Sequence, residues 1–267
     1  MNSKSFANNV SKGKYYFSKS LEKGLRILSL FSKESPVLTQ SQVARVLNLN
    51  MTSTYRYINT LEEMGYLNKD LKTKEIRPTI HCLLFCRNLM GATDHLRLIK
   101  SVVDRIHREN NISVDVVWFV NDTIVRLYHR EAEETLTYHL PDQSKNCLHN
   151  TALGKAYLSS LSDRHVADKI TGIVLTARTK KSIMDQGTLW RELRETRSRG
   201  FSMSVEEYLP GLIAIGAPLV DPVTGQGVGA VSFDFSVLQH RAAEIEKKFG
   251  PLIVETARTL SDLLPPE

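Results

Sequence analysis

Cysteine is scarce in this chain, which has only Cys82, Cys86 and Cys147 among its 267 residues. So few cysteines, and an odd number of them, exclude a disulfide scaffold. Cys82 and Cys86 would share one face of a helix, but no histidine or cysteine nearby has the spacing of zinc ligands. We interpret the pair as small core-facing residues, and we expect neither a metal nor a cofactor.

Long apolar runs are also missing. None approaches the roughly 18 residues that a membrane span needs. The N-terminal stretch "MNSKSFANNVSKGKYYF" is basic but has no apolar centre of the kind found in signal peptides. We therefore expect residues 1–18 to form a flexible basic arm and the protein to be cytoplasmic, without a membrane partner. A hydrophobic content of 42% with 24% charged residues excludes global disorder.

The charges that are present are unevenly distributed. Residues 1–90 hold 14 Lys and Arg against 6 Asp and Glu, whereas residues 91–267 hold 21 against 23. A basic N-terminal third is the electrostatic signature of nucleic-acid binding, although a merely soluble basic domain would look the same.

Three helices and a hairpin follow one another in the basic third. Apolar spacing predicts helices over 19–32, 40–47 and 52–64, with Thr39 as an N-cap. Gly65 suits the C-terminal end of the third helix. Residues 66–79, "YLNKDLKTKEIRPT", indicate two short strands around a basic turn. This order predicts a winged helix-turn-helix over 19–78.

The rest of the chain mixes helices with hairpins. A linker helix is predicted over 79–91, before a domain spanning 92–267. There the pattern favours an α+β fold around an antiparallel sheet. The expected helices cover residues 95–109, 150–160, 163–170, 188–199 and 238–264, and the expected strands lie within 112–120, 123–130, 135–140 and 211–235, with a turn at 121–122.

The third predicted helix, "TSTYRYINTLEEMGYL", has two different faces. Thr54, Tyr57, Ile58, Leu61 and Met64 share a face that would pack on the preceding helices. The opposite face carries Thr52, Ser53, Tyr55 and Arg56 near the N-terminal end, which is the end that enters the major groove. Hydroxyls and an arginine can bond phosphates or bases, while the acids Glu62 and Glu63 lie at the far end. The alternative is an ordinary solvated helix face.

Four separated segments resemble the isocitrate-lyase-regulator (IclR) family of bacterial transcription factors. They are "SLEKGLRILSLF", "LTQSQVARVLNLNMTSTYRYINTLEEMGYL", "LHNTALGKAYL" and "RGFSMSVEEYLPGLIAIGAPLVDPVTGQGVGAVSF". The resemblance implies a winged helix, a linker helix and a GAF-like effector domain, in dimers that often pair as tetramers. It also implies operator binding through Thr52, Ser53, Tyr55 and Arg56. Met51 departs from the pattern, because a basic residue is usual there, and "KEIRPT" replaces the usual tyrosine-bearing wing strand.

The same resemblance implies a pocket for a small organic or aromatic acid, lined by Gly154, Ser204, Ala214, Ser232 and Asp234. Gly154 would let a ligand approach a helix start, where amides attract anions. Ser232 and Asp234 are two apart in a strand and share a face. The family often has cysteine at Ala214 and a small polar residue at Asp234. Because a carboxylate repels anions unless it is protonated or paired, we expect an effector that donates a hydroxyl or amine to Asp234. Alternatively, Asp234 pairs with a base at an interface.

Enzyme motifs are missing. "GQGVGA" is not a dinucleotide fingerprint, "TALGKA" lacks the first glycine and the hydroxyl of a P-loop, and His139 and His149 have no carboxylate set at ligand spacing. We expect no catalytic residues and a DNA-binding regulator, more often a repressor, of a catabolic operon. The competing hypothesis is a ligand-sensing protein-interaction module whose winged helix serves dimerisation. Retardation of DNA in gels distinguishes the two.

Overall fold

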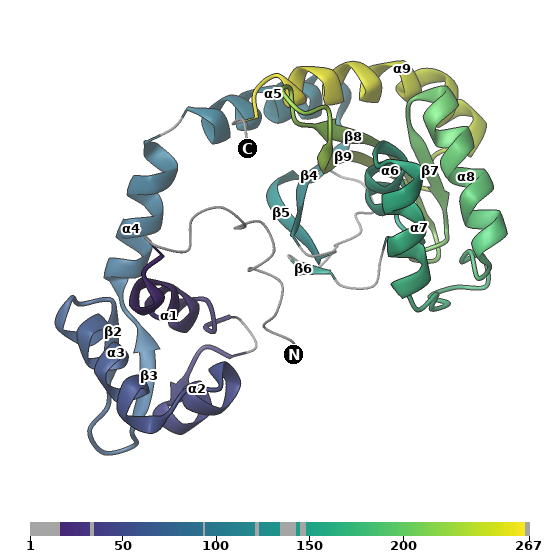
Figure 1. Ribbon diagram of the computed structural model, residues 1–267. Coiled ribbons are helices and arrows are strands. Elements are labelled where there is room, and N and C mark those ends of the chain that lie inside the picture. Colours follow the sequence, from purple (N-terminus) through teal and green to yellow (C-terminus); the bar gives the residue numbers. More distant parts are fainter. Residues whose placement is uncertain are drawn as a thin grey trace. The chain divides into compact units, whose positions relative to one another are not determined.

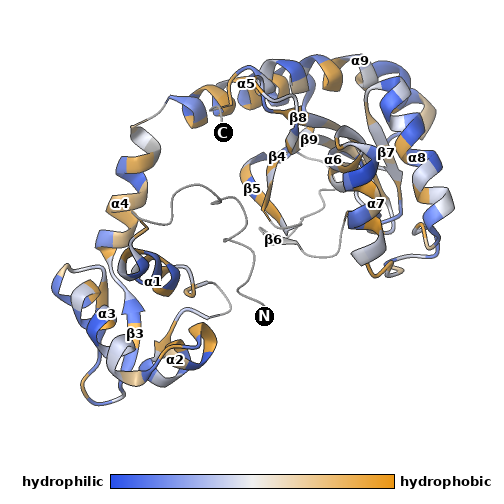
Figure 2. Cartoon of the chain, viewed as in Figure 1, coloured by the Kyte–Doolittle hydropathy of each residue, from blue (hydrophilic) through white to orange (hydrophobic). Residues whose placement is uncertain are grey.

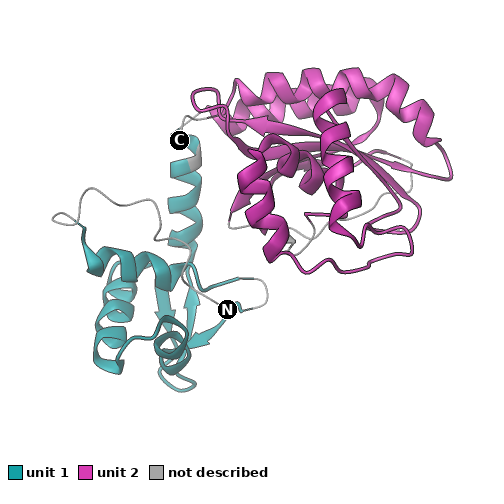
Figure 3. Cartoon of the chain, turned by 45° about the vertical axis from the view of Figure 1, so that its right-hand side comes forward, with its two compact units in different colours: residues 1–93 teal, residues 94–267 magenta. Residues whose placement is uncertain are grey.

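The computed structural model describes residues 17–32, 35–92, 94–120, 123–133, 143–144 and 148–264. The chain divides into two compact units, residues 1–93 and 94–267 (Figure 3). No helix in the described ranges combines the length and the apolar character that crossing a membrane requires.

Unit 1 is a winged helix-turn-helix, as predicted (Figure 1). Its antiparallel sheet has the strand order β1-β3-β2, so the two-residue strand β1 joins the predicted hairpin. The elements are α1 (Lys19–Leu28), β1 (Leu38–Thr39), α2 (Gln40–Leu47), α3 (Met51–Glu63), β2 (Leu67–Lys69), β3 (Glu75–Pro78) and α4 (Ile80–Gly91). Helix α1 ends four residues earlier than the apolar spacing predicted.

Side-chain caps define the short turn between α2 and α3. The Thr39 side chain accepts from the Gln42 amide, and the Gln42 side chain accepts from the Thr39 amide at 2.7 Å, which is a capping box. Asn48 ends α2 in the left-handed region at φ 51°, a conformation that asparagine tolerates. The Asn50 side chain then caps α3 by accepting from the Ser53 amide at 2.7 Å.

The core of unit 1 forms where the three helices meet the sheet. Its buried residues are Ile27, Val43, Leu47, Ile58, Leu61, Leu67 and Ile76. Two sequence-based expectations were wrong. Met64 is exposed, because α3 ends before it. Cys86 is exposed on α4, while the half-buried Cys82 donates to the Tyr66 carbonyl at 3.2 Å.

Unit 2 is built on a six-stranded antiparallel sheet in the order β6-β5-β4-β9-β8-β7, which confirms the predicted α+β class. The predicted strand at 135–140 and the turn at 121–122 lie outside the described residues. The strands are β4 (Ser113–Val120), β5 (Thr123–Arg130), β6 (Gln143–Ser144), β7 (Ser202–Val205), β8 (Leu212–Val220) and β9 (Gly227–Ser236). The helices are α5 (His95–Asn110), α6 (Ala152–Ser160), α7 (Asp163–Gly172), α8 (Gln186–Arg199) and α9 (Ala242–Ser261).

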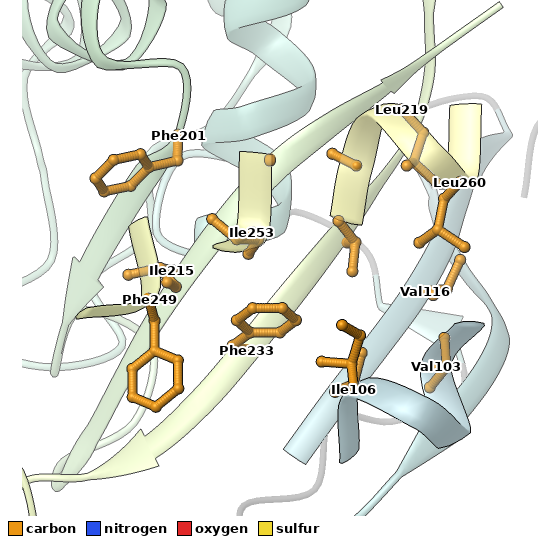
Figure 4. Packing of buried hydrophobic residues seen from close by; sticks show 14 of the residues in the cluster. Val103, Ile106, Val116, Phe201, Ile215, Leu219, Phe233, Phe249, Ile253 and Leu260 are labelled. Carbon is orange, nitrogen blue, oxygen red and sulfur yellow. The ribbon is translucent and has the colours of Figure 1, made fainter. Parts of the chain in front are cut away.

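Helices α5 and α9 cover one face of this sheet, and α6 covers the other. Figure 4 shows Val116, Ile215 and Phe233 meeting side chains of α5 and α9. Strand side chains alternate between faces. The residues of β9 next to Phe233, which are Ser232 and Asp234, therefore point toward α6.

An irregularity in β5 changes this alternation. Val116 pairs with Tyr128 and Val117 pairs with Arg126, so Leu127 is an extra residue with no partner in β4. Such a bulge shifts which side chains share a face. Arg126 and His129 are three apart, a spacing that would place them on opposite faces of a regular strand. The bulge turns both toward α6.

Candidate functional site

The exposed face of α3 carries the four side chains predicted to contact DNA. Thr52, Tyr55 and Arg56 are exposed and Ser53 is half-buried, while Thr54 between them is buried and donates to the Asn50 carbonyl at 2.9 Å. The first turn of α3 contains no charged residue. This face therefore offers hydroxyls, an aromatic ring and one guanidinium to a partner.

The wing lies beside this helix in unit 1. Asp70 Oδ1 accepts from the amides of Lys72 at 2.7 Å and Thr73 at 3.0 Å, which shapes the turn and holds the pKa of Asp70 below its ordinary value. Lys69 Nζ lies 5.5 Å from the centre of the Tyr55 ring, a cation–π contact. The backbone of Lys69 also donates to Glu62 Oε1 at 3.2 Å. Glu62 thus fixes the wing to α3.

Unit 2 holds a small cavity between the sheet and the first turn of α6. The cavity volume is about 10 Å³, roughly what one water molecule requires. An effector of several atoms would have to displace side chains to enter. The lining residues are Thr151, Ala152, Leu153, Ser204, Tyr208, Leu212, Ala214, Ser232 and Asp234.

Four of the five residues predicted to bind an effector line this cavity. Ser204, Ala214 and Asp234 stand side by side across β7, β8 and β9, because Ser204 pairs with Ala214 and Ala214 with Asp234. Ser232 lies two residues before Asp234 on the same face. The strand β7, which the sequence did not reveal, brings Ser204 to this row.

Gly154, which was also predicted to contact an effector, is not among the residues that line this cavity. A Cβ atom there would lie 2.4 Å from Leu148 Cα, so the glycine lets α6 pack against the Leu148 backbone. Its amide already donates to Thr151 Oγ1 at 3.0 Å. The preceding residues, Ala152 and Leu153, contact the cavity instead.

Behind Asp234 lies a buried group of charges that sequence reasoning missed. Asp115 has 0% of its side chain exposed. Its Oδ1 lies 2.7 Å from Arg126 Nε and 3.1 Å from His129 Nδ1. Asp115 pairs with Ser232 across β4 and β9, so the group adjoins the cavity. The isolated acid in the apolar segment "ISVDVVWFV" could have indicated a buried Asp115. No pattern in the sequence indicates the bulge that brings Arg126 and His129 to the same face.

Burial and charge shift two pKa values in this group. Burial, with the nearby Asp115 charge, raises the pKa of Asp234 from 3.8 to about 8, although Ser232, His129 and Arg126 oppose the shift. Burial alone would lower the pKa of His129, but its bond to Asp115 and the charge of that carboxylate raise it overall. Asp234 is therefore mostly protonated near pH 7, which weakens the anion repulsion assumed from the sequence.

A second buried ion pair holds α6 to the loop after β7. Lys155 Nζ lies 2.7 Å from Glu207 Oε1 and 3.6 Å from Glu192 Oε1, and it also donates to the Met203 carbonyl. Burial raises the pKa of Glu207, although the Lys155 charge opposes this. Because Glu207 precedes Tyr208, this pair fixes one wall of the cavity.

Metal ligands do not gather in the part of the chain that the structure describes. His139, one of the two histidines that the sequence offered as metal ligands, lies outside the described residues. The buried His149 places Nε2 at 3.2 Å from the Thr176 carbonyl. Burial lowers its pKa, so this ring is a neutral packing residue.

Two family models match the chain. The "IclR helix-turn-helix domain" matches residues 20–71, and "Bacterial transcriptional regulator IclR C-terminal" matches residues 89–262. Among curated proteins, the Pca regulon regulatory protein of Pseudomonas putida is 22% identical, over 91% of this chain and 83% of that protein. The repressor AllR of Klebsiella pneumoniae is 27% identical, over 91% of this chain and 89% of that protein.

Solved structures share the fold. An IclR transcriptional regulator from Alicyclobacillus acidocaldarius aligns with a TM-score of 0.75 at 18% identity, over 93% of this chain and 99% of that one. An IclR homologue from Microbacterium hydrocarbonoxydans, complexed with 4-hydroxybenzoate, aligns with a TM-score of 0.67 at 17% identity, over 92% and 98%.

Proposed function

Because the chain belongs to the IclR family of bacterial transcriptional regulators, we propose that unit 1 reads an operator with Thr52, Ser53, Tyr55 and Arg56. Effector binding in the cavity of unit 2 controls that reading. The observation that carries the DNA half is the exposed face of α3, with Arg56 on it and Lys69 of the wing against Tyr55. A helix used only for dimerisation would not need to present polar reading groups at its N-terminal end.

DNA retardation in gels tests this proposal. The full chain should retard operator DNA at low salt and lose affinity steeply as salt rises. Arg56→Ala should weaken specific binding by about 1–3 kcal/mol if the guanidinium reads a base. Arg105→Ala, an exposed arginine on α5 of unit 2, is the matched control and should leave binding unchanged. Absence of any retardation at low salt would favour the protein-interaction module instead.

For the effector, we propose a small hydroxylated acid of the sugar-acid or aromatic-acid class. A protonated carboxyl both donates and accepts, so a hydroxyl on the ligand is its natural partner at Asp234. Ser204 and Ser232 add hydroxyls beside it, and the start of α6 favours the ligand's anionic group. That 4-hydroxybenzoate occupies a structural relative is consistent with this class.

A thermal-shift screen of such acids on the full chain tests the effector class. A true ligand at 100 times its Kd should add about 2.7 kcal/mol to stability. Asp234→Ser should reduce binding, whereas Ser236→Ala on the same strand is the control that should not. Strong binding that Asp234→Ser leaves untouched would contradict the role of Asp234.

The remaining parts of the proposal concern assembly and regulation. We propose a homodimer, two of which can pair as a tetramer. It represses an adjacent catabolic operon in the cytoplasm and performs no catalysis. Apolar side chains stand exposed on α1 and α4, among them Leu21 and Leu83, at 64% and 63% exposure (Figure 2), and exposed apolar patches of this kind mark protein contacts. Light scattering of the full chain should give at least the mass of two chains.

A further inference from the structure

The first residue of α3 is an exposed methionine rather than a cation. Met51 is 50% exposed, and Tyr55, one turn later on the same side of the helix, is 48% exposed. Residues four apart on a helix are neighbours. Met51 and Tyr55 therefore form a short apolar strip beside the polar strip of Thr52 and Arg56.

The strip is held in place by contacts within unit 1. Gln40 Nε2, at the start of α2, donates to the Met51 carbonyl at 3.2 Å. The Asn50 cap fixes the same turn through the Ser53 amide at 2.7 Å, and Lys69 covers part of the Tyr55 ring. The backbone that carries Met51 is thus fixed before any partner arrives, which keeps the entropic cost of binding low.

We infer that Met51 reads the 5-methyl group of a thymine in each operator half-site, next to the position that Arg56 contacts. The inference rests on the proposed DNA binding. In the major groove, the thymine methyl is the one apolar feature that base edges offer. Arg56 is the sole cation of α3, so it is the residue of this helix that would hydrogen-bond guanine. The exposed Met51 side chain at the start of the helix is then available to contact a methyl group.

The test uses DNA in which deoxyuridine replaces thymine, a change that removes the methyl and nothing else. A bound sequence is first selected from a pool of random duplexes with the full wild-type chain. Each thymine of that sequence is then replaced singly. One thymine per half-site should show a loss of about fourfold in affinity, the value of one buried methyl, and replacing both should multiply the losses in a dimer.

Variants of Met51 assign the effect to this side chain. Met51→Ala should weaken binding to thymine DNA and abolish the difference between thymine and deoxyuridine, whereas Met51→Leu should keep most of it. Met51→Lys should lose the methyl effect and steepen the salt dependence by about one counterion. Leu238→Ala, an apolar residue of unit 2 that is 77% exposed, is the control and should behave as wild type.

The outcomes separate the two proposals. If the chain selects DNA but every deoxyuridine replacement leaves Kd within twofold, the methyl reading is wrong and the DNA-binding function stands. The inference also fails if the same thymine stays methyl-sensitive in Met51→Ala, because another residue then reads it. If no sequence is enriched at low salt, DNA binding fails and the inference fails with it.

Discussion

The two units place their ionisable side chains in opposite surroundings. In unit 1 the cation proposed to contact DNA, Arg56 on α3, is exposed to solvent, and residues 1–90 carry an excess of positive charge. In unit 2 Asp115 and Asp234 lie inside, at 0% and 8% exposure. Exposed charges act at long range and are screened by salt, whereas buried charges act over a few ångströms and are sensitive to every neighbour. The contrast suits one unit for a polyanion and the other for a small molecule.

The largest expected effect of this contrast is on stability. Asp115→Asn removes the charge that Arg126 and His129 share, and breaking a buried ion group of this kind costs about 3–5 kcal/mol. In unit 1, Glu75→Gln removes the acid that lies 3.0 Å from Arg77 in an exposed pair, and we expect a change of about 0–1 kcal/mol. Urea unfolding of the full chain measures both. Equal costs for the two variants would show that burial makes no difference to the strength of these ion pairs.

A second effect is on the pH dependence of stability. Asp234 keeps its proton in the folded state up to about pH 8 but loses it near pH 4 when unfolded. The folded state therefore binds more protons between these values, and stability falls as pH rises from about 4 to about 8. The full fall would be about 1.4 kcal/mol for each pH unit between these two values. We expect a smaller total fall, on the order of 2 kcal/mol, because a buried site relaxes around a new charge.

Asp234→Asn gives the reference for this titration. The difference in unfolding free energy between wild type and variant should change across pH 4–8 and stay level above about 8. His129 stabilises the folded state below its ordinary pKa of 6.5, and this contribution is lost as pH rises through its raised pKa. Glu207, whose pKa burial raises, titrates in wild type and in Asp234→Asn alike. A difference that stays constant from pH 4 to 8 would show that Asp234 is ionised throughout.

The last effect concerns one glycine from each unit. Gly154→Ala in α6 forces a Cβ against the Leu148 backbone at 2.4 Å, and we expect a loss of about 1–3 kcal/mol. Gly24→Ala in α1 meets nothing within 4 Å and should gain about 0.5–1 kcal/mol, because alanine restricts the unfolded chain and favours helix. Melting temperatures of the two variants should move in opposite directions.

The sequence predicted unit 1 better than the site in unit 2, for a physical reason. Caps such as Thr39 and the alternation of buried and exposed residues along α3 are local, so spacing reveals them. Ser204 lies next to Ala214 because the four-residue strand β7 pairs with β8, and so short a strand leaves little alternation for a sequence pattern to reveal. Gly154 shows the same limit, because the close approach of the Leu148 backbone gives a packing reason for glycine that the sequence did not indicate.

The unpaired Leu127 has a consequence for how such a sensor can diverge. Deleting that one residue would leave Arg126 and His129 two apart in a regular strand, and both would still lie on the Asp115 face of the sheet. Deleting a residue from a strand without a bulge would instead turn its neighbours to the opposite face. The charge group therefore tolerates the loss of one residue at this point of β5, and a related strand that is shorter by one can still hold it.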